Sequence, residues 1–209
     1  MPIEKPPAPG EQKHKLGEEG TRQAKLWLDS TTRVKHSYTN MDDGGPSRLA
    51  FMWPHGGQPY SYDLGGVFRG RPFENDTFVA ESKNYKKAAD QGTHFDKFLA
   101  QTYCTLAKYS RLAQHFIWIT WAPFRSDTWD ELHSSENILK ALDRHRDKVF
   151  GKDEKRLIAE IVDMEIVAHM VENIWLIVLS QKQTKLVISH EDRIELNRIR
   201  DRREYENAH

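Results

Sequence analysis

Cysteine is almost absent from the sequence, and Cys104 is the only one. A lone cysteine cannot form an internal disulfide, which excludes the small secreted proteins that depend on such bridges and suits a reducing compartment. The sequence also lacks an apolar run long enough to span a bilayer, and its first residues lack the apolar core of a signal peptide. We therefore expect a cytoplasmic protein with no membrane partner.

An excess of charge of one sign is missing too. Lysine and arginine together number 31, and so do aspartate and glutamate, so the overall charge indicates no particular partner. A glycine-rich phosphate loop of the P-loop kind is also absent. What is present is a polar chain, 30% charged, whose 11% of aromatic residues can still build a core.

The length of 209 residues allows one large domain, or one domain with an extension. Residues 1–15 are rich in proline and charge, which predicts a mobile tail. The character changes again after Pro123, where charged and mostly helical sequence begins. We therefore divide the chain into a tail (1–15), a core (16–125) and a C-terminal extension (126–209).

Hydrophobic periodicity predicts the order of the elements. The first helix begins at Gly17, and its apolar face carries Gly20, Ala24, Trp27 and Leu28. The rest of the core is predicted as an edge strand near 33–38, strands at 48–53, 60–68 and 77–82, a helix at 93–109 and a strand at 116–121. The extension is predicted as helical sequence at 127–150, a longer helix at 153–172, a β-hairpin of 174–180 with 185–189, and a last helix from residue 189.

The strand at 77–82 is the element around which the core is organised. Side chains alternate along a strand, so Glu81 and Lys83 leave one face and Ser82 leaves the other. A carboxylate placed in this way can hold a divalent cation while the neighbouring lysine orients or deprotonates a water. The Glu-x-Lys triplet is common, however, and by itself it favours an ordinary surface ion pair.

Acidic residues on two other elements could join Glu81. Asp63 lies in the aromatic-rich strand 60–68, where an ionised carboxylate is costly unless something neutralises it. A turn joins this strand to the next one, so we predict a hairpin that brings Asp63 alongside Glu81. On the first helix, Glu18 lies opposite the apolar face and Glu19 on its flank, so Glu19 is the better candidate for a role near the core. Alternatively, both acids only complement the helix dipole.

The order of elements in the core is helix, strand, strand with Asp63, strand with Glu81-Ser82-Lys83, helix, strand. This order resembles the conserved core of the PD-(D/E)XK nuclease superfamily, which has the restriction-endonuclease-like fold. The likeness covers roughly residues 17–123. It implies an α/β fold with a central mixed sheet flanked by helices, to which the extension adds mostly helical sequence and a β-hairpin.

The resemblance also implies a site and a reaction. By analogy with the family, Asp63, Glu81 and the backbone carbonyl of Ser82 would bind Mg²⁺, which Mn²⁺ could replace. Lys83 would assist the attacking water, and Glu19 would add a further catalytic or metal contact. The expected enzyme is a Mg²⁺-dependent deoxyribonuclease, an endonuclease that hydrolyses phosphodiester bonds of DNA.

A basic segment follows the Glu-x-Lys strand. Residues 83–125 contain seven lysines and arginines against two acidic residues, whereas residues 126–180 contain seven against twelve. A polyphosphate substrate would need such a segment, although linear charge blocks often mix in space. The residues expected to contact nucleic acid are Lys86, Lys87, Lys97 and Arg125.

Two alternatives stay open at this point. One is a non-catalytic nucleic-acid-binding or assembly subunit that keeps the fold, although retention of Asp63, Glu81 and Lys83 together argues against it. The other is a nuclease acting on RNA or on single strands. The extension is expected to serve dimerisation, target choice or docking of a partner protein. Its apolar strand at 174–179 must pack on the core or on a second chain, and we favour a homodimer or partner contact over packing on the core.

Overall fold

The computed structural model describes residues 9–84 and 90–208. The α-helices in these ranges are α1 (Pro9–Ser30), α2 (Gly45–Leu49), α3 (Gln91–Tyr109), α4 (Ser135–Arg144), α5 (Arg146–Val149), α6 (Ile158–Ile161), α7 (Met164–Asn173) and α8 (His190–Ala208). The strands are β1 (Val34–Thr39), β2 (Ala50–Phe51), β3 (Tyr60–Ser61), β4 (Leu64–Phe68), β5 (Thr77–Lys83), β6 (His115–Thr120) and β7 (Ile174–Val178). Two short 3₁₀ helices are η1 (Ser126–Glu131) and η2 (Gln183–Lys185).

Within the described residues, five strands form one mixed sheet in the order β1-β4-β5-β6-β7. The pairs β1–β4 and β4–β5 are antiparallel, whereas β5–β6 and β6–β7 are parallel. Strands β2 and β3 form a separate antiparallel pair. The protein is therefore α/β, with a mixed sheet flanked by helices, as the order of elements predicted.

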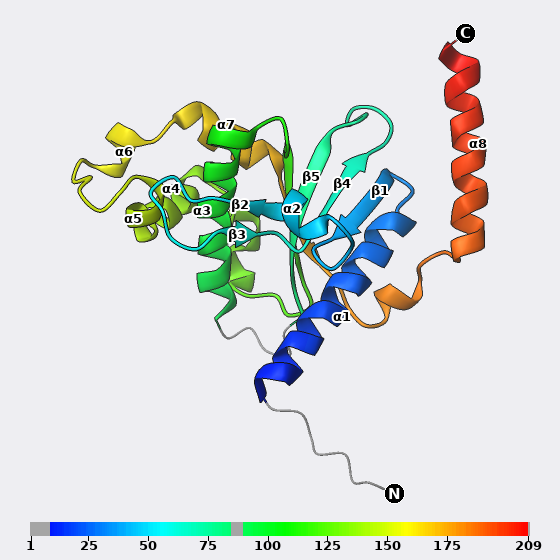
Figure 1. The fold of residues 1–209 in the computed structure, drawn as a ribbon, viewed down its shortest axis with the longest axis horizontal. Helices are drawn as coiled ribbons and strands as arrows, with labels where there is room; N and C mark the ends of the chain where they lie inside the picture. The colour runs from blue at the N-terminus through cyan, green and yellow to red at the C-terminus, as the bar shows by residue number, and fades with distance from the viewer. Residues whose placement is uncertain (1–8, 85–89, 209) are drawn as a thin grey trace, which may run out of the picture.

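The two faces of this sheet carry different helices (Figure 1). Helix α1 covers one face, where Ala80 of β5 packs in a cluster with Ala24 and Leu28. Helix α3 covers the other face with α4 and α7 packed against it, and there Val79 joins a cluster with Phe95. Strand β6 is buried along its whole length because both of its faces are covered, which accounts for the apolar run Phe116–Ile119 at its centre.

Several predicted elements are confirmed. Strands β4 and β5 form the antiparallel hairpin, with Leu64 opposite Ala80. Strand β1 is an edge strand of the sheet, and α3 and β6 lie within two residues of the predicted ranges.

Cys104 is buried in α3, and burial raises the pKa of its thiol to about 12. No helix in the described parts of the chain has the length and apolar character needed to cross a membrane.

Near the N-terminus, three predicted boundaries are wrong. Helix α1 begins at Pro9 instead of Gly17, so residues 9–15 belong to it and not to a tail; residues 1–8 lie outside the described residues. The predicted strand at 48–53 is shortened to β2 because α2 continues to Leu49. The predicted strand at 60–68 is two strands, β3 and β4, which belong to different sheets.

In the C-terminal part, the predicted long helix at 153–172 is wrong. Asp163 caps a new helix there, because its side chain accepts the backbone N–H of Glu165 at 2.9 Å. Its own backbone N–H donates to the hydroxyl of Tyr103 at 2.8 Å, which ties the break to α3. The sequence at 153–172 therefore divides into α6 and α7.

The predicted β-hairpin of 174–180 with 185–189 is also wrong. Strand β7 pairs in parallel with β6, and 186–189 do not form a strand. The apolar strand therefore packs on the core, and the sheet continues across the predicted division at residue 125. Helix α8 stands beside this body (Figure 1), where Arg193 pairs with Asp29 of α1 at 2.8 Å.

Candidate active site

Asp63 lies at the bend where β3 leads into β4. Its backbone N–H donates to the carbonyl of Ala80 at 3.0 Å, and its carbonyl accepts the N–H of Asn40 at 3.0 Å. Its carboxylate accepts the backbone N–H of Ser82 at 2.9 Å. The hairpin thus holds Asp63 against the end of β5, and the predicted juxtaposition with Glu81 is confirmed.

Glu81 and Lys83 leave the face of β5 that looks toward α3. The Lys83 ammonium donates to Glu81 Oε1, and the same nitrogen lies 3.7 Å from Asp63 Oδ2. Their side chains are only 16% and 15% exposed for Lys83 and Glu81, and that of Asp63 is 23% exposed. One ammonium therefore bridges two carboxylates that converge in a partly desolvated site.

The site holds two carboxylates, those of Asp63 and Glu81, against the single ammonium of Lys83. Burial and the nearby Asp63 carboxylate raise the pKa of Glu81 to about 7, although the positive charge of Lys83 opposes this shift. Glu81 Oε2 is buried and has no hydrogen-bond partner among the described residues. A buried carboxylate oxygen without a donor is costly, so a further cation or donor at this position would stabilise the ionised form.

Ser82 connects this site to helix α1. Its hydroxyl lies 3.0 Å from that of Thr21, and the contact is buried. In a strand, the N–H and C=O of one residue point to the same neighbour. Because the N–H of Ser82 points at Asp63, the Ser82 carbonyl faces the Asp63 side, where the resemblance expects a metal ligand.

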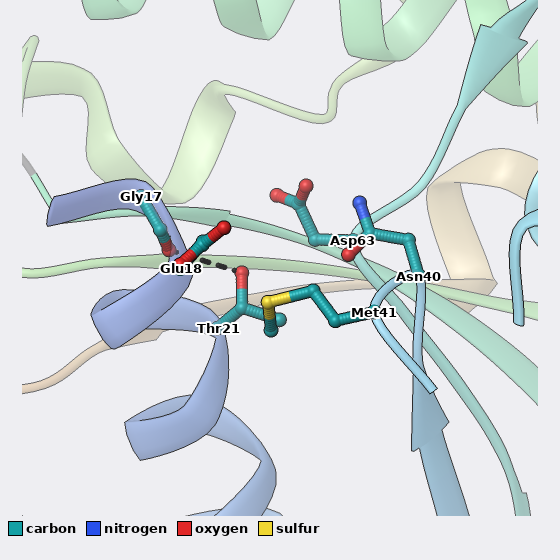
Figure 2. A pocket seen from close by; sticks show the side chains of 6 residues that line it. All are labelled: Gly17, Glu18, Thr21, Asn40, Met41 and Asp63. Carbon is teal, nitrogen blue, oxygen red and sulfur yellow. Dashed lines mark hydrogen bonds between the residues drawn. The ribbon is translucent and has the colours of Figure 1, made fainter. Parts of the chain in front are cut away.

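A cavity of about 420 Å³ opens on the α1 side of Asp63. Figure 2 shows the Asp63 and Glu18 carboxylates extending into the space between α1 and the strands. The residues that line it are Gly17, Glu18, Thr21, Asn40, Met41 and Asp63. Of the predicted site residues, Asp63 lines this cavity, whereas Glu81 and Lys83 are not among its lining residues. Glu18, Thr21 and Asn40 lie beside Asp63 there, and the sequence did not single them out.

The expectation that Glu19 lies nearer the core than Glu18 is wrong. Glu19 is exposed and accepts a hydrogen bond from Gln23 at 2.7 Å, while Glu18 is half-buried at the cavity. The cause is that the buried side of α1 includes the polar residues Thr21 and Asp29. The buried face of α1 that is predicted from hydrophobic residues alone is therefore rotated about the helix axis, away from Thr21 and Asp29. That rotation places Glu19 nearer the core than Glu18, the reverse of what the structure has.

The predicted nucleic-acid contacts have different surroundings. Lys97 is exposed on α3, and its charge reaches Glu81, whose pKa it lowers slightly. Arg125 pairs with Asp96 at 3.3 Å, so its charge is partly neutralised. Lys86 and Lys87 lie outside the described residues.

His94 lies in the first turn of α3. Burial, with the charges of Lys83 and Lys97, lowers the pKa of its imidazole. The residue therefore lies within electrostatic reach of Lys83. No sequence pattern pointed to it, because its proximity depends on how α3 packs on the sheet.

The oxygen atoms at this site are of the kind that a hard cation prefers, and they suit a cation that needs few ligands from the protein. Among the described residues, no group of three or more histidine, cysteine, aspartate or glutamate side chains is arranged to hold a metal. Mg²⁺ usually keeps several waters and takes one or two carboxylates together with substrate phosphates. Asp63, Glu81 and the Ser82 carbonyl could meet that lower requirement, since Glu81 Oε2 has no hydrogen-bond partner in the described part of the chain.

Comparison of the chain with protein-family models, with curated proteins and with solved structures found no match.

Proposed function

We propose that the protein is a Mg²⁺-dependent endonuclease that hydrolyses phosphodiester bonds of DNA. The observation that carries the proposal is the convergence of Asp63, Glu81 and Lys83 at the ends of β4 and β5, where Glu81 Oε2 is buried and has no hydrogen-bond partner among the described residues. Two carboxylates beside an ammonium are the residue types that phosphoryl chemistry uses to hold a cation and to activate water.

Each residue has a distinct role in this proposal. Asp63 and Glu81 hold the cation with the Ser82 carbonyl, and a bound Mg²⁺ supplies charge stabilisation on the phosphate and a more acidic water. Lys83 stays close to both carboxylates and holds or accepts a proton near the attacking water. Lys97, exposed beside the site, attracts the phosphate backbone of the substrate.

The test is a cleavage assay on supercoiled, linear, branched and single-stranded DNA, and on RNA, with Mg²⁺, Mn²⁺ or EDTA. Lys83→Ala should lower the rate by roughly 10²–10⁴-fold, the usual loss when a general base is removed, with little change in DNA affinity. Glu81→Ala should lose Mg²⁺ affinity as well as rate, as measured by calorimetry. Lys35→Ala removes an exposed lysine of β1 and is the matched control.

The assay also separates the proposal from its alternatives. If the wild-type protein and both site variants are equally inert on every substrate but still bind nucleic acid, the enzyme proposal fails and a binding subunit replaces it. If RNA or single strands are cut and duplex DNA is not, the reaction stands and the substrate changes.

A further inference from the structure

A second, smaller cavity lies at the far end of β4 from Asp63. Strand β4 separates the two, so Asp63 and Arg69 are roughly 20 Å apart along the strand. The cavity, of about 190 Å³, is lined by Arg33, Arg69, Gly70, Arg200, Arg203 and Glu204. The cavity therefore lies between the body of the protein and helix α8. None of the residues that line it belongs to the candidate active site.

Arg69 is the unusual residue of this cavity because it is buried with part of its guanidinium unsatisfied. Its side chain is 7% exposed, and its Nη2 donates to Asp201 of α8 at 2.9 Å. Its Nε lies 3.8 Å from Glu204, and neither Nε nor Nη1 has a hydrogen-bond acceptor among the described residues. Buried donors of a charged group are costly to leave unpaired, so an acceptor at this cavity would be favourable.

Two other arginines of the cavity are held in place by the protein. Arg33 donates to the carbonyls of Gly70 and Arg71 at 3.2 and 2.7 Å. Arg200 donates to the carbonyl and the hydroxyl of Thr32, the latter at 2.8 Å. Their guanidinium groups are therefore ordered before any ligand arrives, which lowers the entropic cost of binding.

The charges around the cavity do not cancel. Four arginines line it, and among the described residues the carboxylates of Asp201 and Glu204 lie against Arg69. The carboxylate of Glu74 accepts the backbone N–H of the lining residue Gly70. Counting all three carboxylates, one positive charge is in excess. A phosphate monoester carries about −1.5 to −2 charges at neutral pH, whereas each phosphodiester carries one.

From this geometry we propose that the cavity binds the terminal phosphate of a phosphate monoester or inorganic phosphate. Arginine forks match phosphate oxygens, and the buried Nε and Nη1 of Arg69 supply the donors. The cavity is smaller than the roughly 300–1,000 Å³ of sites that enclose drug-sized ligands. A phosphate group therefore enters it, and the rest of any larger ligand stays outside. This site does not depend on the proposed nuclease activity.

The first test is calorimetric titration of the intact protein with inorganic phosphate at low ionic strength. Arg203→Gln and Arg202→Gln remove one charge each from neighbouring exposed positions of α8, but only Arg203 lines the cavity. Arg203→Gln should weaken phosphate binding by roughly tenfold, and Arg202→Gln should leave it nearly unchanged. Absence of saturable binding at millimolar phosphate, or equal weakening by both variants, would overturn the proposal.

A second test distinguishes the sources of the phosphate. A short oligonucleotide with a 5′-phosphate should compete with inorganic phosphate, and the same oligonucleotide without that group should not. Equal competition by both would assign the cavity to the phosphodiester backbone and reject the monoester. An inorganic phosphate signal with no competition by the phosphorylated oligonucleotide would restrict the ligand to the free ion.

Hydrogen exchange gives an independent readout. Because the cavity joins α8 to the body, bound phosphate should slow amide exchange in 190–208 in the wild type and not in Arg203→Gln. Unchanged exchange in the wild type at saturating phosphate would contradict binding between α8 and the body.

Discussion

Glu81 should make the stability of the protein depend on pH in an unusual direction. Its pKa is about 7 in the folded protein and near 4.5 when unfolded. Between these values the folded state binds a proton that the unfolded state lacks, so the free energy of unfolding falls as pH rises from about 4.5 to about 7. The side chain in the Glu81→Gln variant cannot ionise, so the variant does not share this loss. The free energy of unfolding of Glu81→Gln, relative to that of the wild type, should therefore increase over this pH interval by up to about 3 kcal/mol.

The measurement is urea unfolding of both proteins between pH 4.5 and pH 8 in the presence of EDTA. Glu19→Gln is the control, since Glu19 is exposed and pairs with Gln23 and Arg22 on its own helix. If Glu81→Gln follows the wild-type pH dependence as closely as this control does, the raised pKa is contradicted.

At the residue scale, the sequence was sufficient for some positions and not for others. Asp63, Glu81 and Lys83 could be brought together because strand alternation and a short turn determine which side chains meet in a hairpin. Glu18 could not be chosen over Glu19, because the choice depends on the buried hydroxyl of Thr21. Its partner Ser82 is 61 residues away in sequence, and no local pattern predicts that contact.

At the scale of the secondary-structure elements, the packing of α1 against the end of β5 depends on Gly20. A methyl group at Gly20 would lie 2.5 Å from the Cβ of Asn84, so Gly20→Ala should force the helix away from the strand end. We expect a loss of about 1–3 kcal/mol in the free energy of unfolding, as for other overpacked sites. The measurement is chemical denaturation.

Gly17→Ala is the matched control for this prediction. Position 17 is exposed on the same helix, and a methyl group there would meet nothing within 4 Å. Alanine should therefore stabilise the helix by about 0.5–1 kcal/mol. Equal effects of the two substitutions would show that Gly20 matters only for helix propensity.

The elements themselves were predicted unevenly for a physical reason. Apolar runs identified β5, β6 and β7 as strands, but hydrophobic periodicity does not indicate which strands pair with one another. Strand β7 was therefore assigned to a local hairpin, although it pairs with β6 across the intervening helices. The break at Asp163 had a signal, an N-cap residue inside an apolar period, which was outweighed by the continuous helical pattern.

At the scale of the whole molecule, the sheet needs the C-terminal part of the chain. A chain ending at residue 125 lacks β7 and the helices α4 and α7, which cover β6 and α3. It should show no cooperative thermal unfolding and should bind hydrophobic dyes. A chain ending at residue 188 lacks only α8 and should unfold cooperatively, which circular dichroism can follow. A cooperative transition in the shorter chain would show that 16–125 is an independent domain.

The parallel pairing of β6 with β7 also has a consequence during synthesis. At roughly 5–20 residues per second, a ribosome needs roughly 3–12 s to extend the chain from Thr120 to Val178. Throughout that interval the largely apolar β6 has an unpaired edge, which is a template for association with other nascent chains. Efficient production of this protein should therefore depend on chaperones that shield the chain until β7 has been made.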